Sequence, residues 1–475
     1  MVAIGTMSNY LDRMVLEIAA PFLTRDRTDR DVDAPCLLRV LVGSWRGIAR
    51  TVFVASAVLV SRQALAQTQP VPLTELIPTA YLDSRAKLLQ EIGNLTMFTA
   101  PVDLGPFDTA GVMSSAIVQE TAAFPIGSSS GGFAYAFDTT SGTAIRSSPS
   151  FGPLFAERPL TSGRGKLNVG MTYLHRSFNE LEGKGLKDGS LTFFVPLNYR
   201  GTDSAADLMQ STMNLRLRSD TMTLFATYGL LNKLDVSVAA PIQHVSLDAV
   251  VTSQLVRFGP SSGIPNSEIP STQTTRSGDA SGIGDVAVRA KYNLFNGPGG
   301  AVAAGLDIRL PTGDETNLLG TGRTRTKVYA AVSSAMSKLF PHANFGYTFQ
   351  SDANDNDPFF FGSEFSYAAG AEYVVHPRLT VVGDILGRSL AGEGRLQDKA
   401  TTFQLVPTFA TPAATITTSQ LTYQSGLRLN TTLAAIGAKF NPGSTFIVSG
   451  HALVTLTSNG IKSGITPVLS VDYSF

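Results

Sequence analysis

Short segments of strict alternation between apolar and polar residues recur along the last two thirds of the chain. The C-terminus shows the pattern most clearly, because Leu469, Val471, Tyr473 and Phe475 take every second position and polar residues stand between them. A period of two places the apolar side chains on one face of a strand and the polar side chains on the other. The chain therefore ends in an amphipathic strand whose last residue is aromatic.

Twelve such segments follow residue 165, and each is predicted to be a strand. They span residues 166–178, 207–230, 234–250, 283–295, 301–310, 327–339, 343–351, 363–375, 379–389, 418–440, 445–457 and 464–475. Five connections are short and fall on the side of both chain ends, at 231–233, 296–300, 340–342, 376–378 and 441–444. The fold class is therefore predicted to be all-β. The pattern indicates a transmembrane antiparallel up-and-down barrel over 166–475, with short periplasmic turns and long outer loops.

Two of the predicted strands change phase along their length. In 207–230 the apolar residues move from odd positions such as Leu215 and Leu217 to even positions such as Met222 and Leu224. One extra residue in a strand produces such a slip, so a β-bulge at Ser219–Asp220 is predicted, with a tight turn as the alternative. A similar slip near Thr432 is predicted in the long strand 418–440.

Composition agrees with a membrane barrel. Charged residues make up 16% of the chain, against about 25% in a typical soluble domain, while apolar residues make up 43%. No apolar run reaches the roughly 18 residues of a membrane helix, so the apolar residues are spread along strands. Basic and acidic side chains are equal in number, 37 each, and form no basic stripe, so a nucleic-acid partner is not expected.

The N-terminal region resembles an export signal. Arg46 and Arg50 precede an apolar run at 51–60, and Ala64-Leu-Ala66 follows it. A basic flank, a short apolar core and small residues are the parts of a secretory signal, although a short buried helix has a similar composition. Residues 1–66 are predicted to be an N-terminal extension plus a cleaved signal peptide at about 40–66, with the true start near Val40 or Val42. The only cysteine, Cys36, lies before this signal, so the exported chain needs no disulfide or thiolate metal site.

Residues 67–165 lack the repeated strand alternation of the barrel segments. Residues 76–92 carry a helical stripe, with Asp83 and Ser84 as candidate caps of a helix that starts after Pro78. A Gly-rich run at 127–132 precedes a possible hairpin at 133–146. The segment is interpreted as a plug in the lumen or as a periplasmic N-terminal segment. If the 133–146 hairpin joined the sheet, the barrel would have 14 strands.

Polar residues of the predicted strands should face the lumen. The candidate lumen-lining residues are Asp285, Arg289, Lys291, Asp307, Arg309, Glu372, Asp384, Arg388 and Arg428. Charges in a water-filled lumen either select solutes or pair across strands. Pairing of residue 295 with residue 301 would place Arg289 opposite Asp307, close enough for an ion pair. Arg323, Arg325 and Lys327 are expected in an outer loop, either solvated or in contact with lipopolysaccharide phosphates.

Four motifs resemble a known family. They are GIGDVAVRAKY at 282–292, LPTGD at 310–314, LGTG at 319–322 and HANFGY at 342–347. Together they are similar to outer-membrane barrels of the phenol-degradation meta-pathway family, over roughly 160–475. The resemblance implies a transporter-like barrel, comparable with channels for aromatic hydrocarbons and long-chain fatty acids. It lends no catalytic residue, cofactor or metal ligand. Leu469, Val471, Tyr473 and Phe475 resemble the closing strand that the barrel-assembly machinery reads.

These patterns predict an outer-membrane channel or transporter for small hydrophobic or aromatic solutes. The alternative is a non-transporting surface-exposed barrel whose long loops bind partners. Expected partners are outer-membrane lipid, lipopolysaccharide, the barrel-assembly machinery and a small hydrophobic solute. No local motif resembles the Ser-His pair of outer-membrane phospholipases, and His342 and His376 are expected in turns beside proline, so an enzyme is not predicted.

Overall fold

The computed structural model describes residues 71–95, 98–99, 105–121, 127–128, 132–138, 143–199, 205–257, 271–350, 362–391, 395–405, 414–424 and 426–475. Residues 70–475 form one compact unit. The predicted extension and signal peptide at 1–66 lie outside the described residues. Neither described helix is long and apolar enough to cross a membrane.

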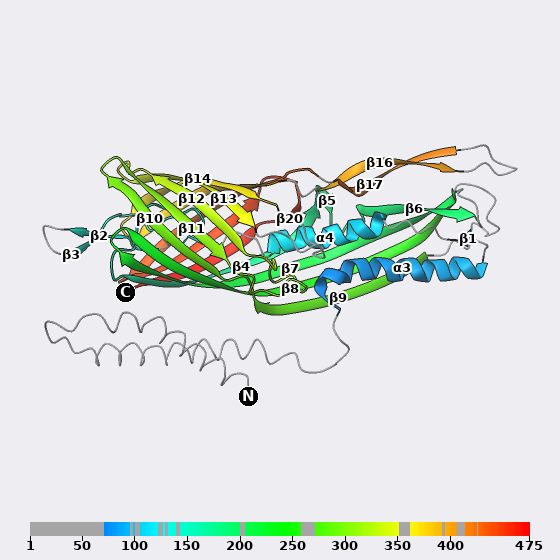
Figure 1. Cartoon of the computed structure of the whole chain (residues 1–475), viewed down its shortest axis with the longest axis horizontal. Helices are drawn as coiled ribbons and strands as arrows, with labels where there is room; N and C mark the ends of the chain where they lie inside the picture. Colours follow the sequence, from blue (N-terminus) through cyan, green and yellow to red (C-terminus); the bar gives the residue numbers. More distant parts are fainter. Residues whose placement is uncertain are drawn as a thin grey trace, which may run out of the picture. The chain divides into compact units, whose positions relative to one another are not determined.

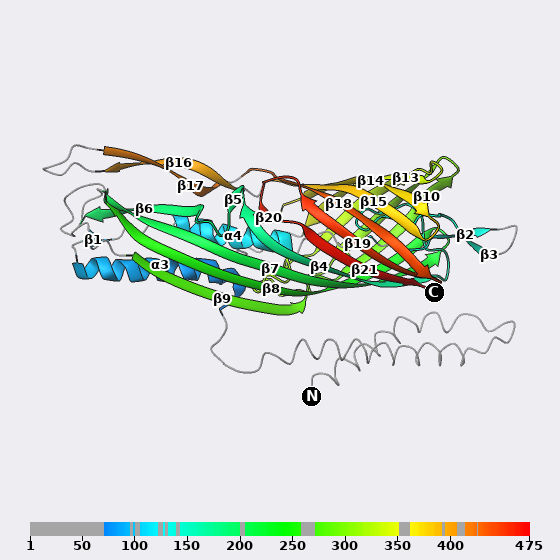
Figure 2. The same ribbon diagram turned by 180° about the vertical axis from the view of Figure 1, so that it is seen from behind.

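Twelve antiparallel strands close into a barrel (Figures 1 and 2). In spatial order they are β4 (Leu167–Leu181), β7 (Ala205–Leu231), β8 (Leu234–Arg257), β10 (Ala287–Gly297), β11 (Gly300–Arg309), β12 (Arg325–Ser333), β13 (Leu339–Gln350), β14 (Glu364–His376), β15 (Leu379–Leu390), β18 (Leu429–Gly443), β19 (Phe446–Thr455) and β21 (Thr466–Ser474). The last strand pairs with the first, from Val468 opposite Leu174 to Ser474 opposite Asn168. The predicted fold class is confirmed, and closure leaves no free sheet edge in the bilayer.

The remaining strands lie outside the barrel wall. They are β1 (Phe98–Thr99), β5 (Lys184–Gly185), β6 (Leu191–Tyr199), β9 (Ser271–Ile283), β16 (Arg395–Leu405), β17 (Ala414–Gln424) and β20 (Ile461–Ser463). The strands β2 (Tyr135–Asp138) and β3 (Thr143–Arg146) pair only with each other, so the barrel has twelve strands and not 14.

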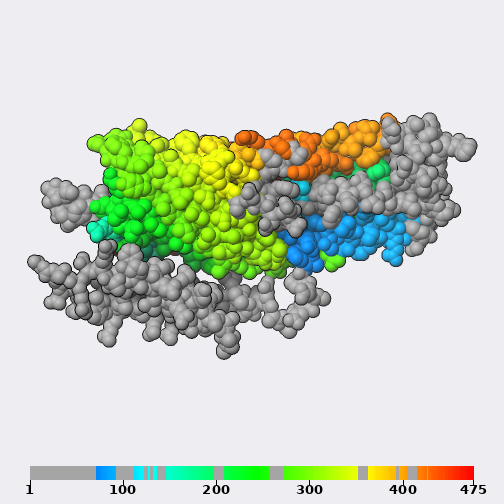
Figure 3. All heavy atoms as spheres, viewed as in Figure 1, coloured from blue at the N-terminus to red at the C-terminus, as the bar shows by residue number. Residues whose placement is uncertain are grey.

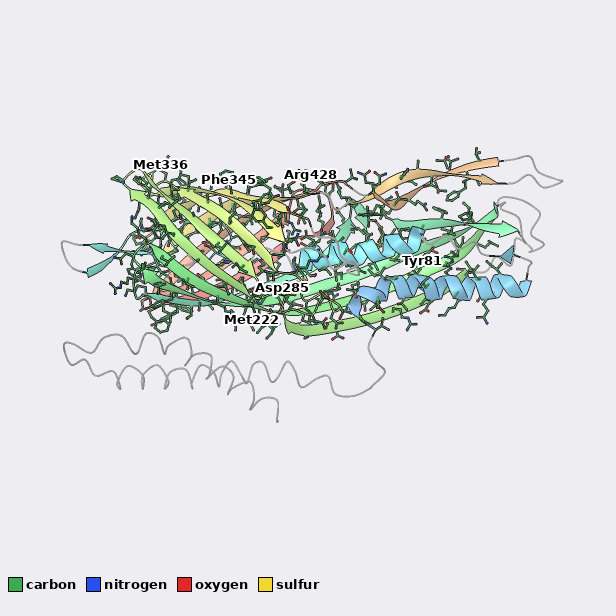
Figure 4. All side chains as sticks on the ribbon, in the orientation of Figure 1. Tyr81, Met222, Asp285, Met336, Phe345 and Arg428 are labelled. Carbon is green, nitrogen blue, oxygen red and sulfur yellow. The ribbon has the colours of Figure 1, made fainter. Side chains whose placement is uncertain are left out.

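The outer face of the barrel is apolar. Apart from Val71, Leu82 and Tyr423, the exposed large apolar side chains lie on the barrel strands or within a few residues of their ends. Met336 and Phe345 are examples on the outer surface (Figure 4). This apolar belt contacts the lipid of the outer membrane. The end of the barrel with the short turns and the C-terminus is the periplasmic end, and the opposite end is called the outer end below.

Strands β7 and β8 run well beyond the barrel, and their apolar face changes sides on the way. Near the periplasmic end of β7, Tyr228 points outward and is 46% exposed, while Thr227 is buried inside. On the side of Asp220 that is nearer the outer end, the inward-facing residues are apolar, as at Leu217, and the outward-facing residues are charged, as at Arg216. The β7–β8 register is continuous from residue 207 to residue 229, so the predicted bulge or turn at 219–220 is wrong. The phase changes because the strand leaves lipid for water, where the apolar side must face inward.

A row of polar side chains marks this boundary on the outer surface. On each of four neighbouring strands, β4, β7, β8 and β9, the outward-facing residues change from apolar to polar at one level. The first polar residues towards the outer end are His175, Asp220, His244 and Ser281, which are cross-strand partners. The Tyr173 hydroxyl donates to Asp220 at 2.6 Å, and His175 Nδ1 lies 2.8 Å from the same carboxylate. We infer that the hydrocarbon layer ends at this row.

Beyond the boundary, two helices cover the inner faces of β7, β8 and β9. Helix α3 (Leu73–Leu95) and helix α4 (Gly105–Thr121) bury an apolar core with these strands. The blue surface in Figure 3 shows that the far side of α3 is exposed. The helix predicted after Pro78 is present but begins at Leu73, so the predicted start and caps are wrong. Proline lacks the N–H that would bind the Thr74 carbonyl, and Ser114 Oγ of α4 donates to that carbonyl at 2.8 Å instead.

Two predicted boundaries are also wrong. The turn predicted at 340–342 lies at 334–338, and Pro341 and His342 belong to β13. The predicted long strand 418–440 is two strands, β17 and β18, and β17 pairs with β16 outside the barrel. Because Arg428 lies in the connection between them, it is exposed and not lumen-lining (Figure 4).

Candidate functional site

The N-terminal segment occupies the barrel interior. Helix α4 ends at the outer end, and the β2–β3 hairpin lies at the periplasmic end (Figures 1 and 2). Residues 127–128 and 150–162 contact inward side chains of the wall. The structure thus places residues 127–128 and 150–162, called the plug below, inside the barrel, whereas the β2–β3 hairpin lies at its periplasmic end and α3 in the extension beyond the barrel.

Wall side chains satisfy the irregular backbone of this segment. Lys439 Nζ donates to the Pro153 carbonyl at 2.9 Å, and Lys291 Nζ donates to the Arg158 carbonyl at 3.2 Å. Asp235 accepts a hydrogen bond from the Ser162 backbone N–H at 2.9 Å. A buried backbone without regular structure needs such partners. Lys291, predicted to line the lumen, therefore faces inward and holds the plug.

Arg289 lies opposite Asp307 as predicted, but the predicted pairing of residue 295 with residue 301 is wrong, because a register shift between Asn293 and Phe295 pairs Phe295 with Val302. The two residues are cross-strand partners, and Arg289 Nε lies 2.7 Å from Asp307 Oδ2. However, Arg289 also donates to the Gly127 carbonyl at 2.6 Å and lies 3.6 Å from Glu157, both in the plug. The two paired side chains are only 7% and 9% exposed. The expectation of a wet lumen is wrong here, because the plug desolvates the pair.

A second group of predicted lumen residues lies deeper in the barrel. Glu372 accepts hydrogen bonds from the Ser150 hydroxyl and from the Gly152 N–H, both in the plug. Asp384 binds His342 Nε2 at 2.7 Å. His342 is buried inside the barrel, so its predicted place in a turn is wrong. Within the described part of the chain, no group of three or more His, Cys, Asp or Glu is arranged to hold a metal ion.

Asp285 joins three of the four family motifs. Its carboxylate accepts hydrogen bonds from the Gly313 N–H at 3.1 Å, the Thr321 N–H at 2.8 Å and the Thr321 hydroxyl at 2.7 Å. Gly313 and Gly320 let the two loop segments touch, since a Cβ on Gly320 would lie 2.6 Å from the Gly313 carbonyl carbon. The 310–322 loop is thereby folded against the outer mouth.

The same loop holds the start of α3. The Thr74 N–H donates to the Thr316 carbonyl at 3.1 Å, and the Leu73 N–H donates to Asn317 Oδ1 at 3.4 Å. Partial burial opposes ionisation of Asp314, but hydrogen bonds from Asn317 and Thr316 hold its pKa below the usual range. A charged Asp314 therefore fixes the loop residues that bind the helix.

The C-terminus of α4 is anchored to the wall over the lumen. Arg388 forms an ion pair with Glu120, and Arg176 donates to the Glu120 carbonyl and, at 3.3 Å, to the Thr121 carbonyl. Thr121 Oγ1 donates to the Leu318 carbonyl at 3.1 Å. The free carbonyls at a helix C-terminus favour cations, so two arginines are well placed there.

A cavity of about 120 Å³ remains between this helix end and the plug. Strands β10–β15 and β18 form most of its wall, while Glu120 closes it on one side and Phe155 and Glu157 on another. Of the residues predicted from sequence, Arg289, Asp307, Arg309 and Arg388 line it. Asp285, Lys291, Glu372 and Asp384 lie elsewhere inside the barrel.

The sequence did not reveal the N-terminal residues at the cavity, Glu120, Phe155 and Glu157. Nothing in a local pattern shows that a segment preceding the barrel enters it. Arg325 and Lys327, predicted in an outer loop, face the lumen from β12. Arg323 is buried as well, at 6% exposure. The alternation of Arg325, Lys327 and Tyr329 with residues 326 and 328 was the signal that could have placed them.

The C-terminal residues have the predicted faces. Leu469, Tyr473 and Phe475 are exposed on the lipid side, Val471 is half-buried, and Ser470, Asp472 and Ser474 are buried inside. Recognition of this strand by the assembly machinery stays a prediction.

Comparisons with known proteins agree with this barrel. A family model described as "Putative MetA-pathway of phenol degradation" matches residues 209–440, so the resemblance predicted from the sequence is confirmed. No curated protein matches the chain.

Solved outer-membrane proteins are similar at low identity. An outer membrane channel from Pseudomonas putida F1 is 16% identical with a TM-score of 0.40, and the match covers 67% of this chain and 97% of that one. The NanC porin is 11% identical with a TM-score of 0.32, covering 65% and 98%. The P. putida toluene transporter TodX is 8% identical with a TM-score of 0.30, covering 66% and 90%. At these scores the likenesses say nothing about a solute.

Proposed function

From the barrel and the match of residues 209–440 to the phenol-degradation family model, we propose that this protein is a channel for small hydrophobic or aromatic solutes. The observation that carries the proposal is a pair of hollows on the two sides of the α4 C-terminus. One is the lumen cavity, which Glu120 lines. The other is an outer groove, which the preceding residue Gln119 lines.

The outer groove is largely apolar. Val112, Ala116, Leu396, Tyr423 and Leu429 contribute most of its apolar lining, and its volume is about 40 Å³. An apolar surface open to the outside suits capture of a hydrophobic molecule from dilute solution. A small displacement of the α4 C-terminus would join the groove to the lumen cavity.

The plug lies in the barrel interior, where Phe155 and Glu157 bound the lumen cavity. Its side-chain and backbone contacts with the wall are polar, as at Lys439 and Asp235. A segment without helix or sheet inside the barrel can shift without breaking a strand ladder. We propose that solutes pass when the α4 end and the plug move, and that the protein lies in the outer membrane after cleavage of its signal peptide.

Uptake by whole cells tests this function. Cells that carry the protein in their outer membrane should take up benzyl alcohol, a neutral aromatic solute that lipopolysaccharide slows, faster than matched cells without the protein, and a large sugar should remain excluded. Equal entry of benzyl alcohol with and without protein would refute the channel. Sequencing of the mature N-terminus tests signal cleavage, which predicts a start near Gln67.

The extension favours one alternative function. Beyond the lipid boundary, β6–β9, β16, β17 and both helices build a folded outer region with charged residues such as Arg216 on its surface. A surface-exposed barrel that binds partners without transport would use this region. Such a protein would show no solute uptake in the same assay, which separates the two functions. The expectation that the protein is not an enzyme stays a prediction.

A further inference from the structure

We propose that the lumen cavity is a binding site for a small carboxylate with a single aromatic or short apolar body. This inference rests on the proposed channel function and names the class of solute. It follows from the two unlike sides of the cavity, its unused polar groups and its size.

One side of the cavity is apolar. Phe155 of the plug, Ala368 of β14, Leu386 of β15 and Leu433 of β18 line it. They belong to a buried apolar cluster or pack against it. The Tyr329 ring extends this surface and lies over Gly305, where a Cβ would approach Tyr329 Cζ to 2.2 Å. An apolar or aromatic body would replace no hydrogen bond on this side.

The other side is rich in cations. Five of them line the cavity, against four carboxylates, and the five are Arg289, Arg309, Arg325, Lys327 and Arg388. Each of these carboxylates has a cationic partner in the protein, although Asp307 Oδ1 itself accepts no hydrogen bond from a described residue. Asp307 pairs with Arg289 at 2.7 Å, Glu364 pairs with Arg325 at 2.9 Å, and Glu120 pairs with Arg388. Glu157 lies 3.6 Å from Arg289, within the cavity, and 3.8 Å from Lys291, which is outside it.

Lys327 remains available for a ligand. Among the described residues it makes no ion pair or hydrogen bond, and its side chain extends across Gly346, while the carboxylates of Glu364 and of Asp307, its cross-strand neighbour, act on its charge from beyond contact distance. Lysine is a compact point charge that can follow a carboxylate without a fixed geometry. The cavity therefore contains a positive charge that the protein does not neutralise by contact.

Two buried donors near Lys327 are also unused. The Tyr329 hydroxyl and Arg325 Nε have no hydrogen-bond partner, and the two residues are 8% and 4% exposed. Buried polar atoms are nearly always satisfied, so two unsatisfied donors at one cavity call for an acceptor. A carboxylate has two oxygens, each of which can accept such bonds.

The volume limits the ligand to about one ring. An apolar cavity of about 150 Å³ holds a benzene molecule, and one water occupies about 30 Å³ of liquid. The cavity of about 120 Å³ is close to the first value, so a fused-ring or long-chain acid would not fit without movement of the plug.

Calorimetric titration of the full-length mature protein in detergent tests the assignment. The probes are benzoate and its neutral counterpart benzyl alcohol. Benzoate should bind at least about tenfold more tightly, because charge-assisted hydrogen bonds are roughly twice as strong as neutral ones. Lys327→Met should remove about tenfold of the benzoate affinity and leave benzyl alcohol unchanged. Lys327→Arg should restore it.

Two further variants serve as controls for misfolding and for general effects of charge. Lys338→Met removes a lysine from the periplasmic turn at 334–338 and should change neither affinity. Tyr329→Phe keeps the ring and should weaken benzoate binding alone. Equal affinities of the wild type for the two probes, or full benzoate affinity in Lys327→Met, would overturn the carboxylate site.

The channel function can fail separately from this inference. Protein-dependent uptake of benzyl alcohol by cells without preferred benzoate binding would refute the carboxylate site and leave the channel standing. Equal uptake of benzyl alcohol with and without the protein would refute the channel, whatever the calorimetry shows.

Discussion

Glu120→Gln should release the C-terminus of α4 from the wall and raise the open probability of the channel. Glutamine has nearly the shape of glutamate, so the helix keeps its packing. The substitution removes the charge that pairs with Arg388, whose side chain is 7% exposed. Arg388 would retain a hydrogen bond to Thr431 Oγ1 at 3.0 Å and a longer one to the Gln119 carbonyl.

The size of the effect follows from burial of the pair. Glu120 is only 13% exposed, so solvent screens the interaction weakly. A hydrogen bond to a charged group contributes about 1.5–3 kcal/mol, and complete loss of a buried partner costs about 3–5 kcal/mol. Since glutamine still offers one acceptor, we expect the lower range. A change of about 1.5–3 kcal/mol shifts the equilibrium between docked and released helix about 10- to 100-fold.

Single-channel recording in planar bilayers measures this shift directly. Glu120→Gln should open at least about ten times as often as the wild type. Glu180→Gln is the matched control, because Glu180 pairs with Lys462 at 3.3 Å with side chains 33% and 25% exposed. Such an exposed pair is worth about 0–1 kcal/mol. Equal open probabilities for the two variants would refute the role of the α4 end as a gate.

Three further predictions concern the barrel. Leu224→Arg should destabilise the assembled barrel by up to about 2–4 kcal/mol, measured by heat modifiability, because residue 224 faces lipid. Ser246→Arg, on the outward face of the neighbouring β8 beyond the lipid boundary, should not. Arg289→Ala should lower the stability to denaturant by about 3–5 kcal/mol, since it leaves Asp307 buried without its partner. Arg216→Ala breaks an exposed pair and should change the stability by no more than about 1 kcal/mol. Deletion of Phe475 should reduce the amount of folded barrel in the outer membrane, and normal amounts would contradict the role of the C-terminal strand in assembly.

The local pattern determined the barrel itself. Alternation predicted the number of barrel strands, because each lipid-spanning strand must present apolar groups on one side whatever its neighbours are. The position of Arg289 opposite Asp307 was predicted correctly, but the turn pairing used to derive it was not, because a bulge between Asn293 and Phe295 changes the register by one residue and is not visible in the alternation. The family motifs were recognisable for the same reason, as they lie close together in sequence around Asp285.

The same pattern was misread wherever the surroundings changed along a strand. The phase shift at Asp220 was interpreted as a bulge, yet the strand is regular and passes from lipid into water. Alternation reports that the two faces differ, but it does not tell which face is inside. That information exists only once α3 and α4 cover the inner side of β7.

Tertiary structure alone decided what fills the lumen. Residues 150–162 form no helix or strand, and their contacts with Lys439, Glu372 and Asp235 join positions far apart in sequence. Two lysines that both point inward therefore differ in role: Lys291 donates to a plug carbonyl, whereas Lys327 forms no ion pair or hydrogen bond with any described residue. Strand periodicity depends on neighbours two residues away, whereas a binding site depends on segments that meet only in the folded chain, which is why the sequence predicted the barrel and not its contents.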